Sequence, residues 1–160
     1  MLVKTRAIII HSIRYREADL IVKAYTKSNG LKSYLVRGVL KSKKGKLRAS
    51  MFQPLTILDL EANHKDKGTL ESIREAKVNP AYQTLTGNIY KSSIAMFLAE
   101  VLHQAIQEEE QNQALYQFLE ESFLWLDANE KYANFHLLFM VKLSSFLGFY
   151  PHQYDPDLPY

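Results

Sequence analysis

The chain has 160 residues, no cysteine and a formal net charge of +3. Its length fits one medium domain or two small ones, and the lack of cysteine excludes disulfides and cysteine-based zinc sites. The first residues lack the apolar core of a signal peptide, and no uncharged run approaches the ~20 residues that span a bilayer. We therefore expect a soluble cytoplasmic protein.

The charge is divided unevenly along the chain. Residues 1–80 hold 17 Lys and Arg against 7 Asp and Glu, a net of +10, whereas residues 81–160 hold 3 against 10, a net of −7. Such asymmetry predicts two modules with different partners, which we place at residues 1–79 and 80–160. Only the first module has the charge of a nucleic-acid-binding domain.

Five stretches of the first module have the composition of β-strands, and we place them at residues 5–13, 20–26, 31–39, 52–61 and 70–78. Ile8, Ile9 and Ile10 form an uninterrupted apolar run, so we expect partial burial on both faces of the first strand. Five short strands joined by turns in about eighty residues predict a small closed barrel, of which the OB-fold is the five-stranded form. An SH3-like barrel remains open from the pattern alone.

The connection between the third and fourth strands is strongly basic. Residues 37–48 contain six cations and no acid, with two glycines and a serine that favour a loop. Like charges repel, so an incoming polyanion such as nucleic acid would stabilise this loop. The alternative is a solvated surface loop that only aids solubility.

Cations and one tyrosine make up the candidate DNA-binding residues. Tyr34 shares a strand face with Lys32, and a tyrosine stacked on a base contributes ~1–3 kcal/mol. Tyr15 is a further candidate for stacking, while we expect Tyr25 to pack in the barrel core or at its end. The complete set is Arg14, Arg16, Lys32, Tyr34, Arg37, Lys41, Lys43, Lys44, Lys46 and Arg48.

The second module reads as three helices, at residues 89–109, 113–126 and 132–147. The third is apolar nearly all round, which predicts a central, buried helix. Three helices leave so apolar a helix without enough cover, which could come from the barrel, from more helices or from a partner. Since the tail stops abruptly, we also expect this module to be incomplete at residue 160. The fold class predicted for the whole chain is therefore α+β, an OB-fold barrel followed by an α-helical domain.

Motifs that carry catalysis are missing from the sequence. The five histidines are scattered without ligand spacing, and there is no phosphate-binding glycine loop or nucleophile elbow. We predict no metal site, no cofactor and a binding protein rather than an enzyme. The alternatives are a barrel that binds RNA or the ribosome, and an enzyme whose site is completed by further residues or a partner.

The order of several short motifs resembles the bacterial RecO family. These motifs are Tyr15-Arg16-Glu17, Val36-Arg37-Gly38-Val39 with the basic loop that follows, Phe52-Gln53-Pro54-Leu55, Leu98-Ala99-Glu100-Val101-Leu102, and the segment from Leu137 to Gly148-Phe149. The resemblance implies a recombination mediator in DNA repair, located in the cytoplasm with the nucleoid. Such a protein binds single- and double-stranded DNA, anneals complementary strands and helps load RecA onto strands coated by single-stranded-DNA-binding protein.

The resemblance also implies two protein partners, RecR and the acidic C-terminal tail of the single-stranded-DNA-binding protein. An apolar groove in the helical module would receive that tail. Only Lys91, Lys131 and Lys142 supply positive charge in this half of the chain. We expect Lys131 to be an ordinary solvated side chain.

Overall fold

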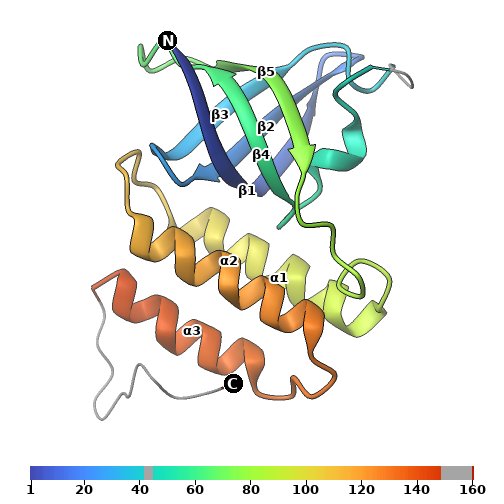
Figure 1. Cartoon of the computed structure of the whole chain (residues 1–160), viewed down its shortest axis with the longest axis vertical. Helices are drawn as coiled ribbons and strands as arrows, with labels where there is room; N and C mark the ends of the chain where they lie inside the picture. Colours follow the sequence, from blue (N-terminus) through green and yellow to red (C-terminus); the bar gives the residue numbers. More distant parts are fainter. Residues whose placement is uncertain (42–44, 149–159) are drawn as a thin grey trace.

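The computed structural model describes residues 1–41, 45–148 and 160, and it confirms the α+β class (Figure 1). Five strands precede three helices, with a short 3-10 helix, η1, at Ala49–Phe52. The strands are β1 (Leu2–Tyr15), β2 (Asp19–Thr26), β3 (Gly30–Val36), β4 (Ile57–Asn63) and β5 (Glu71–Val78); the helices are α1 (Ile89–Ala105), α2 (Gln113–Ala128) and α3 (Phe135–Phe146). None of the described helices has the length and apolarity needed to cross a membrane.

The five strands close into a barrel in the order β1-β2-β3-β5-β4, which confirms the predicted OB-fold. Neighbouring strands are antiparallel, except that β3 and β5 run parallel. The parallel pairing is short, since only Tyr34 with Glu71 and Leu35 with Ser72 are in register. Closure leaves no long free edge, and the weakest seam of the barrel lies between β3 and β5.

The long strand β1 contributes to both hydrophobic cores. Ala7 and Ile9 point into the barrel, whereas Ile8 and Ile10 point outward and pack in the same cluster as the helices. All four are at most 1% exposed. This alternation explains the uninterrupted isoleucine run and confirms the prediction that β1 is buried on both faces.

The helices lie in layers below the barrel, with α1 and α2 next to it and α3 on the far side (Figure 1). The prediction that the third helix is central was therefore wrong. Phe135, Phe139 and Leu143 of α3 are buried, but Leu137 is 58% exposed and Met140 is also exposed. The helix is apolar on two faces, and the described residues cover only one of them.

Several element boundaries differ from those predicted, and three of the differences have a local reason. The fourth strand begins at Ile57 rather than residue 52, because Pro54 and the positive φ of Leu55 (70°) turn the chain just before it. The third strand ends at Val36, ahead of Gly38 at φ 69°. Helix α1 ends at Ala105, and the Ile106 N–H bonds to the Leu102 carbonyl as its last cap.

Polar contacts between the barrel and the helical layer include an ion pair and a backbone hydrogen bond. Arg6 of β1 lies 2.9 Å from Asp59 of β4 and 2.7 Å from Glu120 of α2. At the turn between β2 and β3, the Leu31 N–H donates to the Glu108 carbonyl in the segment that leads to α2. The Tyr25 ring stacks beside that of Tyr116, so Tyr25 packs at the barrel end as predicted.

Candidate nucleic-acid interface

The basic connection after β3 is fixed to the barrel by apolar side chains and by the β1–β2 turn. Val39 is 3% exposed and packs in the barrel core, and Leu47 packs against the same cluster. The Gly38 N–H donates to the Asp19 carboxylate at 2.8 Å, and the Leu40 N–H donates to the Ala18 carbonyl at 2.9 Å. The β1–β2 turn and this connection therefore form one continuous surface.

Most of the predicted cations are exposed, namely Arg14, Arg16, Arg37, Lys41, Lys46 and Arg48. Lys43 and Lys44 lie outside the described residues. Their acidic neighbours are few: Lys41 lies 3.4 Å from Glu17, and Lys46 lies 3.1 Å from Glu75. Exposed pairs of this kind contribute about 0–1 kcal/mol, so a phosphate can replace either carboxylate at little cost.

Tyr34 and Lys32, which were predicted to bind DNA, do not lie on this exposed surface. Tyr34 does share a strand face with Lys32, but that face points into the barrel, and Tyr34 is fully buried. Its hydroxyl lies 2.7 Å from His64 Nε2, and burial raises its pKa above the ordinary value. The prediction that Tyr34 stacks on a base was therefore wrong. The Lys32 side chain is 12% exposed, and its ammonium donates to Asp66 at 2.7 Å.

A groove of about 440 Å³ opens beside the short β3–β5 pairing. Its lining includes the cations Arg37 and Lys65, the acid Glu71, and apolar side chains such as those of Leu35, Leu47 and Ile73. The groove exists because β3 and β5 pair at only two positions, so it opens among the residues that flank the pairing. Apolar side chains together with cations suit a nucleotide, whose base is apolar on its faces and whose phosphate is anionic.

Sequence reasoning missed further cations on this side of the barrel, because they are dispersed and not clustered. Lys65 and Lys67 belong to the β4–β5 loop, and Arg74 lies on β5; all three are exposed. The ion pair between Lys46 and Glu75 brings the basic connection onto β5, next to Arg74. Residues 65–77 hold four cations and three acids, so the sequence has no basic run there that could have been singled out.

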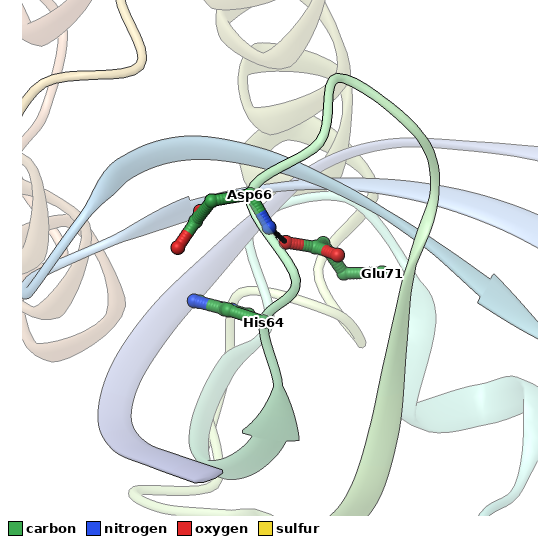
Figure 2. A group of neighbouring side chains, drawn as sticks. All are labelled: His64, Asp66 and Glu71. Atoms are coloured by element: carbon green, nitrogen blue, oxygen red, sulfur yellow. Dashed lines mark hydrogen bonds between the residues drawn. The ribbon is translucent and has the colours of Figure 1, made fainter. Parts of the chain in front are cut away.

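Three potential metal ligands gather at the β4–β5 loop, although the sequence predicted none. Figure 2 shows His64 just after β4, Asp66 in the loop and Glu71 at the start of β5. One ligand atom from each lies within 4.8 Å of those of the other two. The hydrogen bond from Lys32 lowers the pKa of Asp66, and burial lowers that of His64, so the acid is ionised and the imidazole neutral. The search by histidine spacing missed this group because it contains a single histidine.

The helical half offers fewer cations than predicted. Lys91 is 3% exposed, and its ammonium donates to Thr84 Oγ1 at 2.7 Å and to the Asp127 carbonyl at 3.0 Å, so it is not available to an acidic peptide. The Lys142 ammonium lies 4.0 Å from the centre of the Tyr160 ring, and Lys131 is exposed.

An apolar groove of about 480 Å³ is also present in this half. It lies between α1 and the segment that leads into α3, and its residues are mostly aromatic or aliphatic. They are Tyr90, Ser93, Ile94, Phe97, Tyr132, Ala133 and His136. Phe97 is 52% exposed, which is unusual for so large an apolar side chain.

Comparison with known proteins identifies relatives over the whole length of the chain. A family model described as Recombination protein O N terminal matches residues 1–82, and one described as Recombination protein O C terminal matches residues 87–155. The DNA repair protein RecO of Christiangramia forsetii is 54% identical over 159 residues, which cover 99% of this chain and 66% of the relative. Those of Flavobacterium johnsoniae (49%) and Bacteroides fragilis strain ATCC 25285 (42%) match 100% and 97% of this chain. The chain spans 68% and 64% of these two relatives, so it covers about two thirds of the curated proteins that it matches.

Proposed function

Because the chain belongs to the RecO family of DNA repair proteins, we propose that it is a recombination mediator that works by binding and not by catalysis. The barrel binds single- and double-stranded DNA, and the protein anneals complementary strands. It helps to load RecA onto strands coated by single-stranded-DNA-binding protein, together with RecR, in the nucleoid.

The observation that carries this proposal is the cationic surface formed by the β1–β2 turn and the basic connection. Exposed arginines and lysines of the β1–β2 turn and the basic connection meet there, beside the groove between β3 and β5. Binding a phosphate chain to such a surface releases counterions, which favours association. When two strands are bound together, the same cations reduce their mutual repulsion, and pairing then needs no bond chemistry.

The helical half supports the second part of the proposal. An acidic peptide with apolar side chains fits the groove beside Phe97, because apolar contacts there exclude water while His136 and the nearby Lys131 supply polar or cationic groups. We assign this groove to the acidic tail of the single-stranded-DNA-binding protein. Phe97→Ala should weaken binding of a labelled tail peptide at least about tenfold, by fluorescence anisotropy. Met96→Ala removes a side chain that is more exposed than Phe97 (70% against 52%) and lies outside the groove, and this variant should bind as the wild type does.

The DNA surface is tested by the dependence of single-stranded DNA affinity on salt. Replacing Lys41, Lys46 and Arg48 by alanine should weaken binding and reduce the slope of log affinity against log salt by about 0.7 for each phosphate that the variant no longer neutralises. The control replaces three exposed cations on other parts of the surface, Lys4, Lys27 and Lys131.

Equal losses in the two triple variants would show that only net charge matters and would refute the proposed surface. The same assay, repeated with RNA of matched length as competitor, separates DNA from RNA as the preferred ligand. Stronger competition by RNA than by DNA would contradict the DNA-mediator proposal.

A further inference from the structure

One nitrogen of a buried histidine is left without a partner in the barrel. His64 is 2% exposed, and its Nε2 lies 2.7 Å from the Tyr34 hydroxyl. Its Nδ1 is buried and has no hydrogen-bond partner among the residues described. Buried polar atoms are nearly always satisfied, so an unpaired ring nitrogen calls for an explanation.

Two carboxylates share the space around this histidine. Potential ligand atoms of His64, Asp66 and Glu71 all lie within 4.8 Å of one another (Figure 2). Glu71 is 4% exposed, and its carboxylate accepts the backbone N–H of Lys65 at 3.0 Å and that of Asp66 at 3.1 Å. These bonds fix its orientation but leave lone pairs on both oxygens.

We propose that His64, Asp66 and Glu71 form a binding site for a divalent transition-metal ion of the zinc type. A neutral imidazole with two carboxylates suits zinc better than magnesium or calcium, which prefer oxygen ligands only. Zinc–ligand bonds of about 2.0–2.2 Å require ligand atoms about 3.4 Å apart. Ligand atoms that lie up to 4.8 Å apart must therefore approach one another by up to about 1.4 Å. Asp66 is exposed in the loop between the strands and can supply that movement.

The Tyr34 hydroxyl is a suitable hydrogen-bond partner for a histidine that binds metal. A ligating histidine generally donates its second ring N–H to a fixed acceptor, which orients the ring and sets the tautomer. Here Nε2–H donates to the Tyr34 oxygen when the lone pair is on Nδ1, so Tyr34 acts as a positioning residue. Burial inside the barrel also favours the neutral imidazole, the form that binds metal.

Two cations lie near this site, and one of them competes with the metal. The Lys32 ammonium lies 2.7 Å from Asp66, and it must leave that carboxylate when the metal binds. The N-terminal ammonium already donates to Asn63 Oδ1 and to the His64 carbonyl. The two carboxylates carry a formal charge of −2, so a divalent ion neutralises them fully where one lysine does not.

The test is Zn²⁺ binding to the whole chain, measured by competition with a chromophoric chelator and by the ¹⁵N resonances of the histidine rings. We expect one Zn²⁺ per chain and a large shift of the His64 Nδ1 resonance. Asp66→Asn should weaken binding at least about tenfold, and since Asp66 is exposed the variant should fold. Lys32→Met removes the competing ammonium and should tighten binding.

The matched control is Glu17→Gln, which removes one exposed acid from another loop and should bind Zn²⁺ as the wild type does. The ring resonances distinguish this site from chance binding at the other four histidines. An unshifted His64 resonance at saturating Zn²⁺ would overturn the proposal, as would equal affinities of the wild type and Asp66→Asn.

Discussion

The imidazole rings of His11 and His103 stack where the barrel meets α1, with their centroids 4.0 Å apart and their planes 8° from parallel. Lys23 Nζ lies 3.4 Å from His103 Nδ1, so the ring nitrogen accepts from the ammonium. Burial, together with the charges of His11 and Lys23, lowers the pKa of His103, and Glu100 opposes this in part. The junction is therefore built around a neutral His103.

The first prediction concerns the pH dependence of stability. A histidine whose pKa is lower in the folded state binds fewer protons there than in the unfolded chain. The free energy of unfolding should therefore fall as the pH drops below about 6.5, the ordinary pKa of histidine. His103→Phe keeps a stacked ring that cannot ionise, so urea unfolding between about pH 7.5 and about pH 5 should show a smaller loss of stability. An unchanged loss in this variant would show that the pKa of His103 is the same in the folded and unfolded states, which would contradict the prediction.

The second prediction concerns Arg6, which joins β1 and β4 to α2. Its guanidinium bonds to Asp59, to Glu120 and to the Asn79 carbonyl. Arg6→Met leaves the half-buried Glu120 with one fewer charged partner, and urea unfolding should show a loss of about 1–3 kcal/mol. Lys46→Met breaks an ion pair on the exposed surface and should cost under about 1 kcal/mol. Equal losses would mean that the Arg6 contacts contribute no more than solvated pairs do.

Elements that depend on local patterns were predictable from the sequence. The five strands, their turn at Gly30 and the three helices follow from alternation, helical periodicity and glycine placement. Which strand face points inward is a different matter, because it depends on how the barrel closes. The pattern placed Lys32 and Tyr34 on one face correctly, yet nothing local showed that this face was the interior.

Contacts between residues far apart in the chain could not be predicted from the sequence. A lysine such as Lys91 is expected at the surface. Only the folded chain brings its ammonium to the Asp127 carbonyl, 36 positions away. The cluster of His64, Asp66 and Glu71 depends on the loop that connects β4 to β5, whose course no spacing rule reveals. The basic connection was predictable because its charge is contiguous, whereas Arg74 joins the same surface only through the fold.

The third prediction concerns Gly30, at the turn between β2 and β3. Its φ is +69°, and a Cβ there would overlap the Glu110 carbonyl. Gly30→Ala should therefore destabilise the protein through backbone strain and through displacement of the segment that leads to α2. Gly68 has nearly the same φ, +70°, with open space around it, so Gly68→Ala isolates the backbone strain. We expect Gly30→Ala to cost at least about 1 kcal/mol more in thermal or urea unfolding. Matching losses would show that Glu110 moves aside freely.

The fourth prediction separates the two tyrosines that the sequence linked to base stacking. Tyr34 lies inside the barrel with its hydroxyl on His64, whereas Tyr15 is 37% exposed with the Arg16 guanidinium over its ring. Tyr34→Phe should lower the free energy of unfolding by about 1–2 kcal/mol, because His64 loses a buried partner, and leave single-stranded DNA affinity unchanged. Tyr15→Ala should do the reverse, losing up to about tenfold in affinity by anisotropy while folding normally. Weaker DNA binding by a stably folded Tyr34→Phe would show that the barrel interior opens to the bases.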